Sequence, residues 1–89
     1  MDSSELFSRL PAEIKKWAAA QLNTEKLTMG EMNTLALGRY ERNDSLSVYD
    51  PEAGCQVTAF ACDRDNFKFV ELVSHDDYPM SFWIAPLSK

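Results

Sequence analysis

The first half of the chain has a spacing of apolar residues that is typical of amphipathic helices. Apolar positions recur about every 3.6 residues as far as residue 42. Pro11 interrupts the first series, and proline is tolerated in the first turn of a helix but not in its interior. We therefore predict a short turn over residues 3–9 and a first helix over residues 11–22.

A second helix is predicted over residues 28–42. Thr28 and Glu31 have the spacing of a capping box, and Leu27 with Met32 has that of a hydrophobic staple. The predicted buried stripe consists of Met32, Leu35, Ala36 and Tyr40. Because this helix follows another after a short polar break, it has the place of a recognition helix in a winged helix-turn-helix protein.

From residue 45 onward the apolar period changes to about two, which is typical of strands. Strands are predicted at residues 45–50, 55–62, 66–73 and 80–85. The connecting segments are short and contain proline, glycine, aspartate and asparagine, which favours hairpins. The predicted fold class is α+β, with two N-terminal helices packed on one face of a four-stranded antiparallel β-meander. Residues 1–89 are predicted to form a single domain.

Composition favours a folded, cytoplasmic protein. Of 89 residues, 45% are apolar, and 14 acidic against 9 basic side chains give a net charge of −5. The N-terminal residues contain no apolar stretch of the length that a signal peptide or a membrane span requires, so no membrane association is expected. Cys55 and Cys62 fall in one predicted strand and point to opposite faces, which excludes a disulfide between them and fits a reducing compartment.

The distribution of charge argues against direct DNA binding. Residues 43–89 carry eight acidic and three basic side chains, and such an excess of acid repels phosphates. The predicted second helix carries Arg39 and Arg42 only at its C-terminal end, away from the positions that usually read bases. We interpret it as a core helix and keep a winged-helix DNA-binding regulator as the alternative.

No catalytic or metal-binding motif stands out. His75, Asp76 and Asp77 are consecutive, and three adjacent loop residues rarely converge on one ion, so we interpret them as a polar hairpin loop. The sequence contains no glycine-rich phosphate loop and no nucleophile elbow. We expect a protein that is not an enzyme and that needs no metal or cofactor.

Two surfaces are predicted to bind another protein. The later strands are apolar on both faces, whereas two helices cover only one, so an apolar face of Thr58, Phe60, Leu72 and Trp83 is left for a partner or a second copy. Glu71 leaves this assignment open, because a slip of one residue exchanges the faces. In a second hypothesis the opening turn or the C-terminal residues cover this face.

The second surface is an acidic rim. In a meander the first and third hairpin loops lie at the same end, which groups Asp50, Glu52, Asp76 and Asp77. Such a rim would steer the protein onto a basic surface of its partner, for example one that otherwise binds nucleic acid. The simpler interpretation is that these loop tips are only solvated.

The leading hypothesis is therefore a small acidic cytoplasmic protein that binds and regulates or inhibits another protein without catalysis. Compact acidic domains of this size are typical of phage antagonists, antitoxins and immunity-type proteins, an analogy that rests on size and charge alone. A winged-helix regulator is the alternative, and a structural subunit that acts as a homodimer is third.

Overall fold

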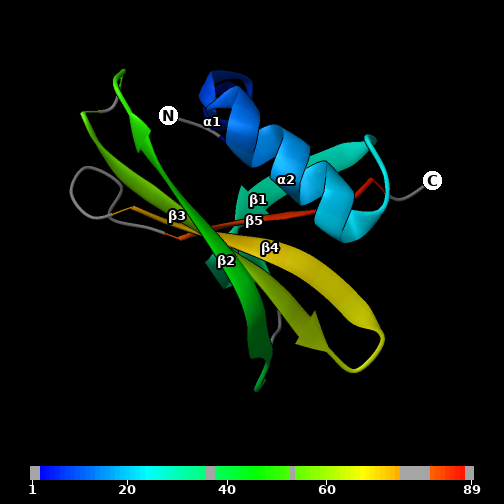
Figure 1. Ribbon diagram of the computed structural model, residues 1–89. Coiled ribbons are helices and arrows are strands. Elements are labelled where there is room, and N and C mark those ends of the chain that lie inside the picture. Colours follow the sequence, from blue (N-terminus) through cyan, green and yellow to red (C-terminus); the bar gives the residue numbers. More distant parts are fainter. Residues whose placement is uncertain (1–2, 36–37, 53, 75–80, 88–89) are drawn as a thin grey trace.

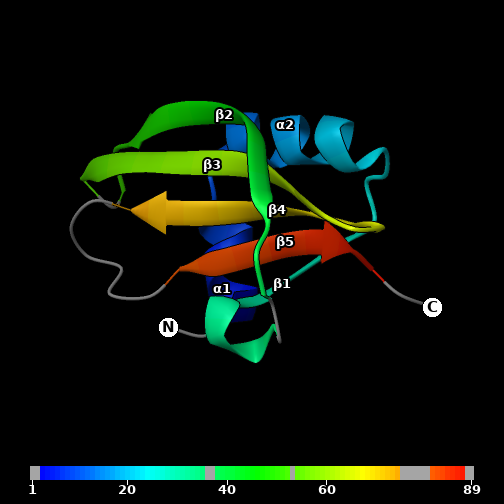
Figure 2. The same cartoon turned by 90° about the horizontal axis from the view of Figure 1, so that it is seen from below.

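The computed structural model describes residues 3–35, 38–52, 54–74 and 81–87, which form an antiparallel sheet with helices on one face (Figure 1). The helical elements are α1 (Ser3–Arg9), α2 (Ala12–Leu22) and the short 3-10 helix η1 (Met32–Thr34). The strands are β1 (Leu27–Glu31), β2 (Glu41–Asp50), β3 (Cys55–Arg64), β4 (Phe67–Ser74) and β5 (Phe82–Pro86). Their order in the sheet is β1-β5-β4-β3-β2, so β1 and β2 are the edge strands. Figure 2 shows α1 and α2 behind the sheet and η1 in front of it.

The predicted fold class is wrong in the number of strands and in the second helix. The sheet has five strands rather than four, and residues 27–34 form β1 and η1. Thr28, expected to cap a helix, instead lies opposite Ala85 in the β1–β5 pair. Helix propensity over a short window is a weak preference, and the ladder that β1 forms with β5, more than 50 residues later, outweighs it.

The predicted helix over residues 11–22 is confirmed as α2. Pro11 is its N-cap, and Asn23 ends it in the left-handed conformation with its N–H donated to Ala19 O. Ile14 and Ala18 are completely buried on the side that faces the sheet. Residues 3–9, expected to form only a turn, form the helix α1.

The main core lies between the helices and the sheet. It contains Leu10, Ile14, Ala18, Val57, Ala59, Val70, Leu72, Phe82 and Ile84. Side chains alternate along each strand, so the other face of the sheet carries a second set of residues. That second face has its own smaller cluster, built on Cys62, Phe69 and Ala85. In the described part of the chain, no helix is long and apolar enough to cross a membrane.

Candidate protein-binding surfaces

One row of residues crosses the second face of the sheet, on the side away from α1 and α2. The strand registers place Ser45 opposite Phe60, Phe60 opposite Glu71, Glu71 opposite Trp83, and Trp83 opposite Gly30. Glu71 is only 5% exposed, although it is a carboxylate within a mostly apolar face. A buried carboxylate requires compensating donors, and this face supplies them.

Glu71 receives donors on both of its carboxylate oxygens. Tyr40 donates its hydroxyl to Oε2 at 3.0 Å, while Arg42 approaches Oε1 with Nε at 2.9 Å and Nη2 at 2.8 Å. The guanidinium of Arg42 also lies over the ring of Phe60, 4.2 Å from its centroid. These contacts tie the start of β2 to the middle of β4, so we interpret Glu71 as the centre of a structural clamp.

Burial and the carboxylate of Glu71 determine the pKa shifts of Tyr40 and Arg42. Burial raises the pKa of Tyr40, and the hydrogen bond and charge of Glu71 raise it further. Burial alone would lower the pKa of Arg42, but the hydrogen bond and charge of Glu71 outweigh it, so that this pKa is raised. Both shifts move the pKa further above neutral pH, where the phenol is neutral and the guanidinium is charged.

The apolar part of the second face is covered by the connection between β1 and β2. Met32, Leu35 and Tyr40 pack against the second cluster. The indole Nε1 of Trp83 lies within hydrogen-bonding distance of Glu31 O, at 2.8 Å, and of Thr34 Oγ1, at 3.1 Å. The covering segment is therefore neither of those expected from the sequence, and it leaves less apolar surface for a partner.

The residues predicted for an uncovered face are divided between the two sides of the sheet. Phe60 and Trp83 lie on the second face and are partly buried there, and Thr58 lies on the same face, 3.1 Å from the hydroxyl of Ser47. Leu72 is 4% exposed and belongs to the helix-covered core. In β4 the assignment has thus slipped by one residue, and Glu71 takes the place that was expected for Leu72.

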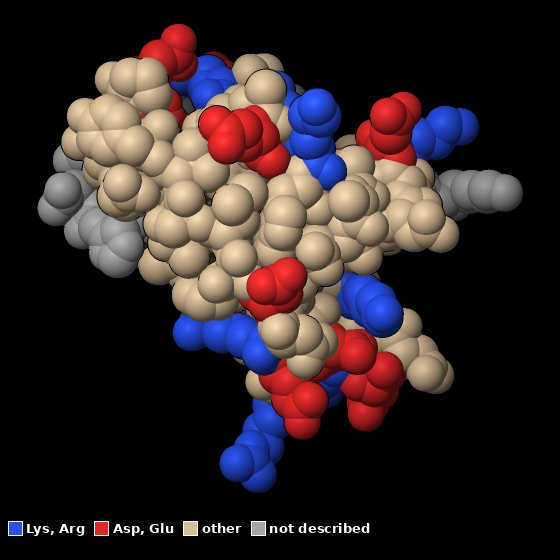
Figure 3. All heavy atoms as spheres, viewed as in Figure 1, with Lys and Arg blue, Asp and Glu red and all other residues tan. Residues whose placement is uncertain are grey.

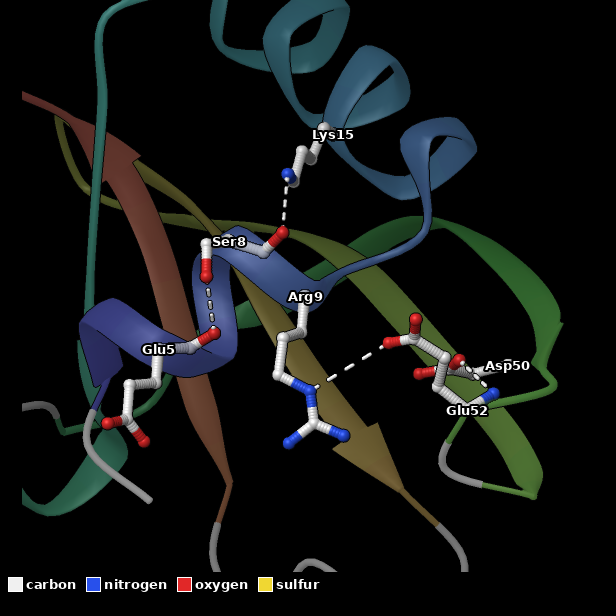
Figure 4. A network of polar contacts seen from close by, with 6 residues as sticks. All are labelled: Glu5, Ser8, Arg9, Lys15, Asp50 and Glu52. Carbon is white, nitrogen blue, oxygen red and sulfur yellow. Dashed lines mark hydrogen bonds and ion pairs between the residues drawn. The ribbon is translucent and has the colours of Figure 1, made fainter.

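The predicted acidic rim is described only in its first half (Figure 4). Asp50 is 6% exposed, and its Oδ1 accepts the backbone N–H of Glu52 at 3.0 Å, which orders the β2–β3 turn. Glu52 is exposed and faces Arg9 Nε across 3.8 Å. Asp76, Asp77 and the neighbouring His75 lie outside the described residues.

Cys55 and Cys62 are buried and form no disulfide, and Cys62 lies beside the clamp. Burial and the nearby charge of Glu71 raise the pKa of Cys62 to about 11, and its thiol donates to Phe60 O at 3.4 Å. A neutral, enclosed thiol is a poor nucleophile at physiological pH. Among the residues that the structure describes, no group of three His, Cys, Asp or Glu side chains is arranged to hold a metal ion.

The outer edge of β2 is a candidate surface that the sequence analysis missed. No strand of the described chain pairs with this edge, although β2 is ten residues long. Its first half carries charged side chains and a register shift between Arg42 and Asp44, two features that commonly protect edges. Residues 45–49, named here the edge strip, contain no charge, proline or glycine, and their register with β3 is unbroken.

The edge strip is also exposed. Figure 3, viewed from the same side as Figure 1, shows a largely uncharged surface over the second half of β2, between charged side chains near its start and others beside the helices. Tyr49 in this strip is 56% exposed. The opposite edge differs, because β1 has only five residues and contacts α1. The sequence signal was present in the uncharged "SLSVY" after the charged "ERND", and the first strand of the predicted meander also lies at an edge.

These features define a class: a five-stranded antiparallel sheet with α-helices on one face and an edge strand whose second half lacks charges and register shifts. Comparison with known proteins finds no matching family model, no similar curated protein and no similar solved structure. The functional argument therefore rests on the surfaces of this chain alone.

Proposed function

We propose that this protein is a non-catalytic regulator or inhibitor that binds an extended segment of another protein as an added strand beside β2. The observation that carries the proposal is the uncharged edge strip of residues 45–49, whose outer side pairs with no described strand and whose Ser45 N–H donates to Asp44 Oδ1 at 2.8 Å. In this binding mode the backbone hydrogen bonds supply affinity, and the alternate side chains supply specificity. A cytoplasmic location belongs to the same proposal, and two thiols that form no disulfide are consistent with a reducing compartment.

The surroundings of the strip support this mode of binding. Leu46 and Val48 are partly buried against the main core, and an added strand would extend that core outward. On the second face, Ser47 and Thr58 form a small polar surface beside exposed Tyr49. The strip therefore offers an apolar side and a polar side to the alternate residues of one bound segment.

The alternative, a winged-helix DNA-binding regulator, depended on a recognition helix at residues 28–42. Leu27–Glu31 is a strand, so the element that would enter the major groove is not formed by these residues. Without that element no observation favours this function over protein binding. Weak DNA affinity remains a prediction from charge, which a mobility-shift assay at low salt tests.

Selection from a random peptide-display library on the immobilised full chain tests the proposed function. Amide hydrogen exchange of the complexes is expected to show new protection within residues 45–49. The double variant Ser45→Lys with Ser47→Lys is expected to abolish binding, because lysines on an edge oppose strand addition. The matched control, Ser45→Thr with Ser47→Thr, keeps a short hydroxyl side chain and should bind. Selected peptides that protect only other elements, or that bind both variants equally, refute the proposal.

A further inference from the structure

Four side chains on one face of β2 set the chemistry that a bound segment meets. Leu46 and Val48 pack against the main core, and because side chains alternate along a strand, Asp44 and Asp50 lie on the same face. Asp44 is exposed and Asp50 is buried. The exposed carboxylate of Glu52 lies just beyond Asp50, so both ends of the strip are acidic.

We infer that the partner segment has the pattern basic-x-apolar-x-apolar-x-basic, an inference that rests on the proposed function. In an antiparallel pair, residues directly opposite share a face and have Cβ atoms about 4.5 to 5.5 Å apart. Apolar side chains opposite Leu46 and Val48 therefore extend the core. Basic side chains opposite Asp44 and Asp50 meet carboxylates, and the pattern is the same in both directions along the chain.

The same charges disfavour a second copy of this chain as the occupant. In a symmetric dimer, β2 would pair with β2 of the other copy in the antiparallel direction, about a two-fold axis perpendicular to the sheet. An axis at Ser47 places Leu46 opposite Val48 of the other copy, but it also places Asp44 opposite Asp50. Moving the axis to Leu46 places Asp44 opposite Val48, and moving it to Val48 places Leu46 opposite Asp50. Each register thus sets a carboxylate against a carboxylate or against an apolar side chain, and each copy carries a net charge of −5.

Two synthetic heptapeptides test the pattern, Lys-Thr-Val-Thr-Val-Thr-Lys and Glu-Thr-Val-Thr-Val-Thr-Glu, both with blocked termini. Binding to the full chain is followed by NMR titration, and hydrogen exchange locates the site. At low ionic strength the lysine peptide is expected to bind about tenfold more tightly than the glutamate peptide, since attraction to the carboxylates of Asp44 and Asp50 replaces repulsion by them. The difference should shrink in high salt, because exposed charges are screened.

Single charge-neutralising variants show whether the position of the charge matters. Asp44→Asn is expected to reduce the preference for lysine about threefold, because one of the two acidic ends is removed. Glu25→Gln is the matched control: it removes the same charge from an exposed position just before β1, at the opposite edge of the sheet, and should leave the preference unchanged. An equal loss in both variants would show a general charge effect and overturn the inference.

The outcomes separate the inference from the proposed function. If both heptapeptides bind equally, or if neither binds while display-selected peptides of another pattern protect residues 45–49, the inferred pattern is overturned and the proposed function stands. A free protein that is dimeric, with protection across residues 45–49, shows that a second copy occupies the edge and overturns the inferred partner. If no selected peptide protects the strip, the proposed function fails as well.

Discussion

Gly30 lies against the indole of Trp83, and the substitution Gly30→Ala tests whether this contact holds the β1–β2 connection over the sheet. A Cβ atom built on Gly30 would lie 2.7 Å from Trp83 Cε2 and closer still to Cζ2. The indole would have to move, although its Nε1 lies close to two acceptors, Glu31 O and Thr34 Oγ1. We expect the variant to be less stable and the connection to loosen.

The expected magnitude follows from these contacts. Overpacking typically costs about 1 to 3 kcal/mol, and loss of the indole hydrogen bonding adds about 1 kcal/mol. Replacing glycine by alanine returns roughly 0.5 kcal/mol through the lower entropy of the unfolded chain. The net decrease in the free energy of unfolding is therefore about 1.5 to 3.5 kcal/mol, which lowers Tm by at least about 6 °C for a chain of this size.

Urea denaturation monitored by tryptophan fluorescence measures this change, with Gly38→Ala as the matched control. A Cβ atom on Gly38 would meet only Arg64 Nη2 at 3.6 Å, an ordinary contact, so the control should be neutral or slightly stabilised. If both alanine variants unfold at the same urea concentration, the close packing of Gly30 against Trp83 does not stabilise the fold, and this reasoning is refuted.

Three further predictions concern charged and reactive groups. Glu71→Gln is expected to lower the free energy of unfolding by about 2 kcal/mol in urea denaturation, since Arg42 loses its charged partner; no change would show that the clamp is not stabilising. Burial raises the pKa of Cys62 from 9.0 to about 11, so between these pH values the folded state keeps the thiol proton that the unfolded state loses. The free energy of unfolding of the unmodified protein should therefore fall, relative to that of Cys62→Ala, as the pH rises through this interval. A parallel pH dependence of the two proteins in thermal unfolding would contradict that shift. Glu52→Gln should change the free energy of unfolding in urea denaturation by less than about 0.5 kcal/mol, since both Glu52 and Arg9 are exposed, and a larger loss would mean that their 3.8 Å pair is stabilising.

Several features of the fold could be predicted from the sequence because they depend on interactions between residues close together in the chain. Pro11 can only begin a helix, and α2 begins immediately after it. The period of two after residue 45 matches β2 to β5, since alternation reports directly on the two faces of a strand. The two faces of β3 also followed from this alternation, with Thr58 and Phe60 on the side away from the helices.

The structure of residues 27–42 was decided by tertiary contacts. Thr28 and Glu31 satisfy the local pattern of a capped helix, but β1 gains a complete ladder with β5 and a contact between Gly30 and Trp83. The local sequence of residues 27–42 does not show that β5, about 50 residues later, pairs with this segment. Backbone pairing and burial therefore outweigh its weak preference for helix. The covering of the second face by this connection has the same origin.

The position of the candidate site likewise depends on tertiary structure. Leu72 and Glu71 exchange faces with a slip of one residue, and only the register of β4 against β3 and β5 resolves it. The edge strip was recognisable as a strand from its own residues, but β2 stayed at the edge because β1 joined the sheet beside β5 rather than beside β2. A strand's own sequence specifies its two faces, whereas its neighbours in the sheet determine whether its backbone groups remain open to a partner.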